Sequence, residues 1–154
     1  MTKKPGFTRI LWPTDFSPGA KAALPHAVSL AAGAGAELVV LHVLSMAPMY
    51  AVPEVSAGLW DEWDKQTRAE AERQLGKLVT QLQKAKLRTK TILVRGVPFE
   101  QILRAAKRLK CDLIVLATHG RTGLRHVLMG SVAENVVRRA SCPVLTVRPP
   151  RFKS

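Results

Sequence analysis

The sequence has only two cysteines, Cys111 and Cys142, among its 154 residues. They are too few and too widely spaced for a disulfide framework or a metal cluster, so we expect both to be reduced thiols. His42, His119 and His126 also lack the tight spacing of metal ligands, and each is interpreted as a histidine with a structural partner or a loop residue. The sequence therefore predicts no metal site of its own.

Long apolar runs are absent as well. No stretch reaches the roughly 18 apolar residues of a membrane-spanning helix. The opening segment MTKKPGFTRILW lacks the apolar run and small residues of a signal peptide, so a cytoplasmic location is expected. With 47% hydrophobic residues, the chain suits one compact domain. We expect this domain at residues 8–148, with flexible tails at 1–7 and 149–154.

Several motifs of catalysis and ligand binding are missing. There is no GxxxxGK[ST] phosphate loop, and the GAGAEL segment at Gly33 precedes a strand, whereas a dinucleotide fingerprint follows one. Neither Ser17 nor Ser131 lies in a G-x-S-x-G elbow, which argues against nucleophilic catalysis. No aromatic RNP strand, GXXG clamp or zinc finger indicates a nucleic-acid-binding module.

Acidic residues are scarce, and the formal net charge is +13. Such a charge attracts polyanions and phosphorylated ligands without specifying which. Residues 84–110 hold a single acid, Glu100, against nine cations: Lys84, Lys86, Arg88, Lys90, Arg95, Arg104, Lys107, Arg108 and Lys110. A solvated helix surface is the simpler interpretation of this basic face. The alternative is a nucleotide-free binding module that uses it to engage a polyanion or a protein partner.

What the sequence does contain is an alternation of apolar runs and amphipathic segments. Ser17 and Pro18 mark a helix start, Gly33 a helix end, and Pro25 a kink. Strands are expected at 9–13, 37–43, 89–94, 112–117 and 143–147, and helices at 18–33, 59–87, 98–109 and 131–140. This order predicts an α/β fold, a single-domain, five-stranded parallel sheet with helices on both faces.

Ligands of such folds bind beyond the carboxyl ends of the strands. There, the stretch DLIVLATHGRTGLRHVLMGSVAE (112–134) predicts a strand, a glycine loop and a helix. Backbone N–H groups and a helix N-terminus at a strand end are a natural seat for an anion such as phosphate. The segment 44–58 has no clear period and is long for a loop, so we interpret it as a cover for a site at the strand ends.

Motifs along nearly the whole chain, from Thr8 to Val147, resemble the universal stress protein family. They are PTDFS, LHV, DLIV, THGRTGL, GSVAENV and CPVLTVR. The ATP-binding subgroup has the pattern Gly, two residues, Gly, nine residues, Gly and then Ser or Thr. Gly120, Gly130 and Ser131 fit this spacing, whereas Ala117 occupies the first glycine position. Alanine carries a cost there only if the backbone needs a positive φ.

The resemblance implies an adenine nucleotide alpha hydrolase-like, Rossmann-like fold that binds ATP, with or without Mg²⁺, in a regulatory role in the stress response. It implies no efficient enzyme and weak ATPase activity at most. It also implies a homodimer through the last strand, Val144 to Val147. The expected nucleotide-binding residues are Pro13, Thr14, Asp15, Val43, Leu116, Ala117, His119, Gly120, Arg121, Gly130, Ser131, Val132 and Ala133.

Two of these residues have simpler explanations from the sequence alone. Ser131 and Glu134 have the spacing of a capping box, in which Ser131 caps the helix and Glu134 reaches back. Asp15 is well placed to close a turn before Ser17 with its side chain. Capping does not account for the glycines at 120 and 130, and we therefore favour nucleotide binding.

Overall fold

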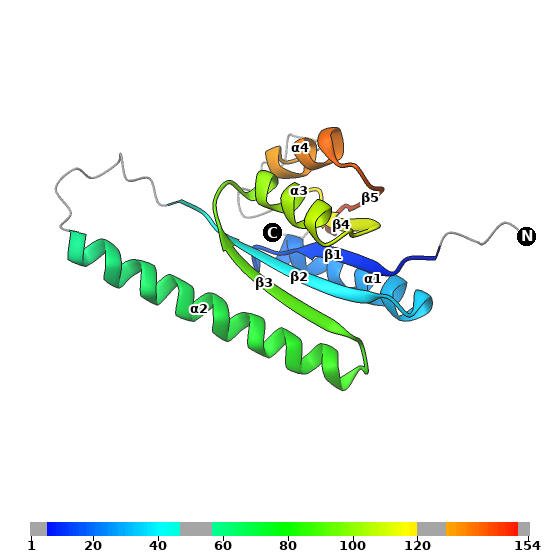
Figure 1. Cartoon of the computed structure of the whole chain (residues 1–154), viewed down its shortest axis with the longest axis horizontal. Coiled ribbons are helices and arrows are strands. Elements are labelled where there is room, and N and C mark those ends of the chain that lie inside the picture. The colour runs from blue at the N-terminus through cyan, green and yellow to red at the C-terminus, as the bar shows by residue number, and fades with distance from the viewer. Residues whose placement is uncertain (1–5, 47–56, 120–128, 151–154) are drawn as a thin grey trace, which may run out of the picture.

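The computed structural model describes residues 6–46, 57–119 and 129–150, which form a parallel sheet between two layers of helices (Figure 1). The strand order is β3-β2-β1-β4-β5, and every pair is parallel. The elements along the chain are β1 (Arg9–Pro13), α1 (Pro18–Ala34), β2 (Glu37–Leu44), α2 (Ala57–Lys84), β3 (Thr89–Arg95), α3 (Pro98–Arg108), β4 (Leu113–Ala117), α4 (Ser131–Arg139) and β5 (Val144–Val147). The predicted fold class is confirmed.

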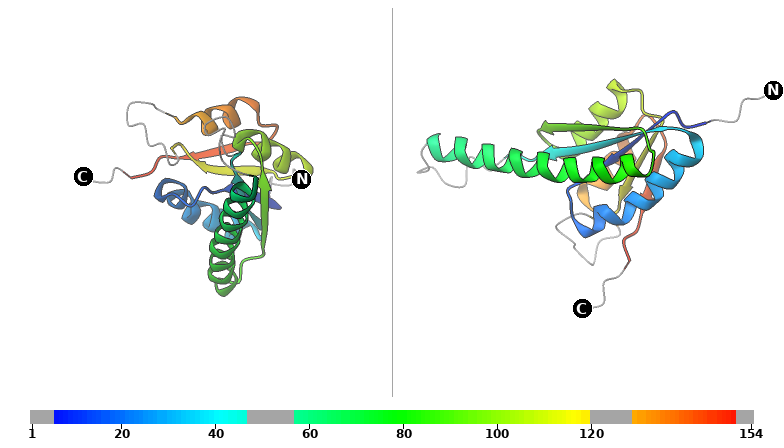
Figure 2. Two further views of the ribbon diagram at one scale, coloured as in Figure 1. Left: turned by 90° about the vertical axis from the view of Figure 1, so that its left-hand side faces the viewer. Right: turned by 90° about the horizontal axis from the view of Figure 1, so that it is seen from below.

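Two apolar cores lie on opposite faces of the sheet because successive strand side chains alternate. Ile10, Leu38 and Val40 pack in the core beneath α1 and α2. Leu11 and Val39 pack in the core beneath α3 and α4. The views in Figure 2 show these helix pairs on the two sides of the sheet. The three inner strands are buried on both faces, which explains their nearly continuous apolar sequences.

All four helices end at residues other than those expected: α3 and α4 each end one residue early, at Arg108 and Arg139, and α1 and α2 end beside a left-handed residue. α1 continues past Gly33, and its C-cap is Gly35, which has the left-handed φ of 65° and donates its N–H to Ala31 and Ala32. α2 ends at Lys84 rather than Leu87, and Lys86 adopts a left-handed φ of 59° just beyond it. In both cases, the left-handed residue after the helix defines its end.

α2 is much longer than β3, the strand that it packs along. Its 28 residues span about 42 Å, whereas the seven residues of β3 span about 23 Å. Figures 1 and 2 show its N-terminal part extending beyond the sheet, and its buried residues begin only at Ala71. An ion pair between Arg95 at the end of β3 and Asp64 connects this part to the sheet.

The expected cover segment, 44–58, can be followed only in part. Residues 47–56 lie outside the described residues.

None of the helices in the described part of the chain is both long and apolar enough to span a membrane.

Candidate functional site

The strand order reverses at β1, whose neighbours are β2 on one side and β4 on the other. In α/β sheets this switch point opens a crevice at the carboxyl ends of the strands. α1 starts directly after β1, and α4 is the helix that follows β4. Two helix N-termini are therefore associated with the switch point, where partial positive charge favours an anion.

The chain after β1 is held by a set of short-range hydrogen bonds. Thr14 Oγ1 accepts the N–H of Phe16 at 3.0 Å, and Asp15 Oδ1 accepts the N–H of Ser17 at 2.9 Å. Ser17 Oγ in turn accepts the N–H of Ala20 and caps α1. The turn predicted for Asp15 is confirmed, and Asp15 has a further interaction beyond it.

A histidine from β2 is hydrogen-bonded to the backbone of this turn. His42 is 8% exposed, and its Nδ1 donates to the carbonyl of Thr14 at 2.8 Å. In a neutral imidazole, this bond fixes the proton on Nδ1 and leaves Nε2 unprotonated. Phe16 stacks on the same imidazole, with 4.4 Å between ring centroids. Phe16 has a left-handed φ of 62°, rare for a bulky residue. No pattern in the sequence indicated this role for Phe16.

At the end of β4, alanine fits the position where the family pattern has its first glycine. Ala117 is the last strand residue and pairs with Val147 of β5. Ala117 is not among the residues with positive φ, so its methyl group causes no backbone strain. Thr118 follows, buried, with its N–H donated to Val147 and its hydroxyl 2.9 Å from His119 Nδ1.

Gly130 lies directly against the backbone at the end of β4. Its N–H donates to the Thr118 carbonyl at 2.6 Å, and a Cβ on Gly130 would lie 3.2 Å from that oxygen. Its φ of −68° is open to any residue, so space and not conformation favours glycine. The contact joins the start of α4 to the end of β4.

The capping box predicted at Ser131 is wrong. The N-cap of α4 is Gly130, no side chain caps the helix within the described residues, and Glu134 instead pairs with Arg138 at 3.3 Å. Ser131 is the first helical residue and is exposed. The N–H groups of Ser131, Val132 and Ala133 belong to the first turn, which the helix itself leaves without acceptors. The simpler explanation of Ser131 is therefore lost.

Gly19 is a glycine of the site that no motif in the sequence indicated. A Cβ at this position would lie 2.5 Å from the carbonyl oxygen of His119. The first turn of α1 thus touches the chain that leaves β4, 100 residues away in sequence. Only the close approach of two backbones requires glycine here, and a single glycine after Pro18 carried no signal of it.

Most of the expected nucleotide-binding residues lie at the carboxyl ends of the strands, around the switch point. Pro13, Thr14 and Asp15 are at the end of β1, Val43 near the end of β2, Ala117 and His119 at the end of β4, and Gly130, Ser131, Val132 and Ala133 at the start of α4. Leu116 is buried in the core beneath α3 and α4. Gly120 and Arg121 lie outside the described residues.

Comparison with known proteins gives one consistent family. The model of the Universal stress protein family matches residues 6–148. Universal stress protein MJ0531 of Methanocaldococcus jannaschii is 34% identical over 94% of this chain and 84% of its own. The solved structure of MJ0577 superposes with a TM-score of 0.82 at 32% identity, covering 96% of this chain and 99% of the other.

Other solved structures agree on the fold. Universal stress protein UspA from Lactobacillus plantarum superposes with a TM-score of 0.78 at 30% identity, covering 93% of this chain and 99% of the other. More distant structures hold nucleotides: a universal stress protein in complex with cAMP at 24% identity, one from Arabidopsis thaliana with AMP bound at 18%, and one from Archaeoglobus fulgidus with dAMP at 21%. At this distance they show a shared fold alone.

Proposed function

Because the chain belongs to the universal stress protein family, we propose that it binds ATP or a related adenine nucleotide at the carboxyl ends of β1, β2 and β4. One observation carries this proposal: no side chain among the described residues caps the first turn of α4, which starts at Gly130, and the Gly130 backbone lies against Thr118 at the switch point. Related folds with AMP, cAMP and dAMP support the choice of an adenine nucleotide.

Each part of the nucleotide has a candidate partner. The adenine lies near Asp15 and the backbone of Val43, and the nucleoside lies beside Leu116 and Ala117. The phosphates accept hydrogen bonds from the Ser131 hydroxyl and from N–H groups of the first turn of α4. His119, Gly120 and Arg121 of the THGR segment complete the phosphate side.

The proposed role is regulatory, with nucleotide occupancy as the signal in a stress response. The motifs supply no general base positioned to activate water, so weak ATPase activity at most is expected. Among the described residues, no group of three or more His, Cys, Asp or Glu gathers to hold a metal ion. Mg²⁺, if it accompanies ATP, is carried chiefly by the phosphate oxygens.

Gly130→Lys tests the phosphate site. The new side chain must enter the space beside Thr118 and the first turn of α4, so ATP binding should be lost in equilibrium dialysis. Gly33→Lys is the matched control, because a Cβ there meets no atom within 4 Å and the charge change is the same. Unchanged affinity in a folded Gly130→Lys protein would show that the phosphate site is elsewhere.

Nucleotide released from the purified protein by denaturation and identified by mass spectrometry tests the ligand class directly. An adenine nucleotide is the expected result. A protein that carries none and binds none in dialysis would favour the nucleotide-free module that uses the basic face at 84–110. Two cations of that face are already engaged, since Arg88 donates to the carbonyl of Gly35 and Arg95 pairs with Asp64.

We also propose a homodimer through β5, which forms one edge of the sheet. Leu145 is 37% exposed on this strand, and Val144 and Val147 are half-buried. A two-fold copy pairing antiparallel along β5 would satisfy the free backbone groups and cover Leu145. Pro143 before the strand and Pro149 and Pro150 after it limit the length of the pairing.

A further inference from the structure

A groove separate from the proposed nucleotide site lies between α2 and the edge strand β3. Its volume is about 390 Å³. Apolar side chains line it together with one basic and one acidic side chain, and its lining residues are Arg68, Glu72, Leu75, Gly76, Val79, Thr91 and Leu93. β3 is the outermost strand on this side of the sheet (Figure 1). The groove is thus bounded by a helix and by a strand with one free edge.

The backbone groups along that free edge can be assigned from the pairing with β2. Leu38 donates its N–H to the carbonyl of Arg88, and Gly96 donates its N–H to the carbonyl of Leu44. In a parallel pair, the N–H and C=O of one residue point the same way and alternate along the strand. The backbone groups of Thr91 and Leu93 therefore point outward, and no described strand pairs with them.

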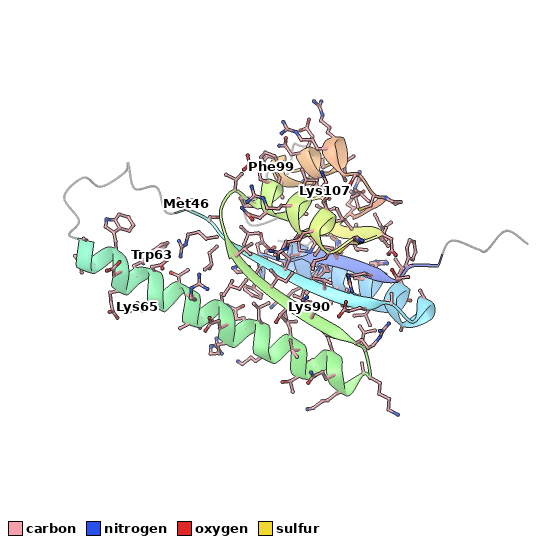
Figure 3. The ribbon with its side chains drawn as sticks, in the orientation of Figure 1. Met46, Trp63, Lys65, Lys90, Phe99 and Lys107 are labelled. Carbon is pink, nitrogen blue, oxygen red and sulfur yellow. The ribbon has the colours of Figure 1, made fainter. Side chains whose placement is uncertain are left out.

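The side chains of β3 alternate in the same register. Leu93 packs in the core beneath α2, whereas Ile92 packs in the opposite core. Thr91 and Leu93 thus face the groove, and Lys90 extends from the other face of the strand (Figure 3). A strand added at this edge would place every second side chain in the groove and the others on the side of Lys90.

The groove has room for such side chains because α2 carries a glycine at its wall. A Cβ added to Gly76 would meet no atom within 4 Å. Leu75 and Val79 of α2 and Leu93 of β3 supply apolar contacts. Side chains of moderate size, such as valine, suit this space, since small apolar pockets between a strand and a helix select alternate residues of an added strand.

The positive charges around β3 disfavour a second copy of the chain at this edge and favour an acidic segment. Lys86 comes just before the strand and Lys90 lies within it, and both are exposed. A second copy pairing along the same edge would bring these cations together, and opposed like charges are unfavourable. An acidic segment would instead be attracted, with its carboxylates on the side of Lys90.

We propose that the β3 edge and the groove form a docking site for an extended acidic peptide of a partner protein, with alternating apolar and acidic residues, which adds as a sixth strand. Its backbone pairs with Thr91 and Leu93, and its apolar side chains enter the groove beside Gly76. The groove shares no residue with the proposed nucleotide site.

The probe is a short fluorescein-labelled peptide of alternating Glu and Val, titrated with the full chain by fluorescence anisotropy. Binding is expected for this peptide and not for a Lys and Val peptide or for a Glu and Val peptide N-methylated at alternate positions. Failure of the first peptide to bind, or equal binding of the N-methylated one, overturns the proposal, because strand addition needs the peptide N–H groups.

Variants of the protein locate the site. Thr91→Pro removes one outward N–H, which an edge strand tolerates, and should weaken binding about tenfold, whereas Thr91→Val keeps the N–H and the affinity. Gly76→Trp fills the groove and should abolish binding, whereas Lys77→Trp, on the exposed side of α2, should not. Unchanged binding in Gly76→Trp overturns the site. If the parent protein forms oligomers and Thr91→Pro abolishes them, the β3 edge binds a second copy, which also overturns the proposal.

Discussion

Gly19 and Gly130 touch the chain at the end of β4 from two different helices. Gly19 of α1 approaches the carbonyl of His119, and Gly130 at the start of α4 donates to the carbonyl of Thr118. These contacts hold the two helix N-termini against the strand end that forms the proposed phosphate site. At the scale of single residues, the site therefore depends on two glycines that allow close backbone contacts, as well as on polar side chains.

Gly19→Ala should destabilise the protein, because its Cβ would lie 2.5 Å from a backbone oxygen, which cannot rotate away as a flexible side chain can. Overpacking of this kind costs about 1–3 kcal/mol, measurable by urea unfolding. Gly76→Ala is the matched control in open space within α2 and should stabilise by up to about 1 kcal/mol. Equal effects of the two substitutions would contradict the close approach at Gly19.

The thiols should be poorly reactive in the folded protein. Burial raises the pKa of Cys111 to about 11, and burial likewise raises the pKa of Cys142. Since the thiolate is the nucleophile, Cys111 in a Cys142→Ser variant should react with a disulfide reagent at pH 8 far more slowly than after unfolding. Rapid labelling of the native protein would contradict this. Both residues are free thiols in the structure.

At the scale of elements, Asp112 joins the amino ends of β1 and β4. Its carboxylate accepts the N–H and hydroxyl of Thr8 and the N–H of Arg9. Burial alone would raise the pKa of Asp112, but these hydrogen bonds outweigh it and hold the pKa below its usual range. The first strand is thereby fixed to a strand about 100 residues later.

Asp112→Ala should cost about 1–2 kcal/mol at pH 7, since hydrogen bonds to a charged acceptor are lost at a partly exposed site. A folded-state pKa below the unfolded value of about 3.9 stabilises the native state above that pH and ceases to do so as the pH falls through the folded pKa. The difference between parent and variant in urea unfolding should therefore shrink below about pH 4. Asp61→Ala, at an exposed site in α2, should change stability by less than about 0.5 kcal/mol.

At the scale of the whole molecule, the two edges of the sheet differ in character. β3 carries the exposed Lys90 and ends at Arg95, which pairs with Asp64, whereas β5 presents Leu145 among uncharged residues. Cations on an edge oppose pairing with an identical copy, and an uncharged apolar edge favours it. The proposed homodimer at β5 and the proposed peptide site at β3 follow from this difference.

Leu145→Lys should convert the dimer into a monomer. The new ammonium groups would face each other across the two-fold axis, or be buried against the partner's strand, and either is costly. Light scattering at micromolar concentration gives the mass of parent and variant. A parent that is already monomeric, or a variant that stays dimeric, would rule out this interface. Thr91→Val, on the opposite edge, serves as a control that leaves the mass unchanged.

The sequence by itself determined the elements and the fold class. Buried parallel strands need apolar residues on both faces, so the strand expected at 37–43 was identified without any tertiary information, and the structure has it at Glu37–Leu44. The order of elements required crossovers and a parallel sheet. The turn at Asp15 was also predictable, because an Asp side chain bonds to a backbone only two residues away.

Only the tertiary structure decided the strand order and the contacts between distant backbones. The order β3-β2-β1-β4-β5 brings Gly19 to His119 and Gly130 to Thr118, and no local pattern encodes either approach. It also decided that Gly130 and not Ser131 begins α4 as its cap, and that Ala117 lies in a strand where alanine is unstrained. Propensities and caps act over a few residues, whereas these contacts join segments that lie further apart, from 12 residues for Thr118 and Gly130 to 100 residues for Gly19 and His119.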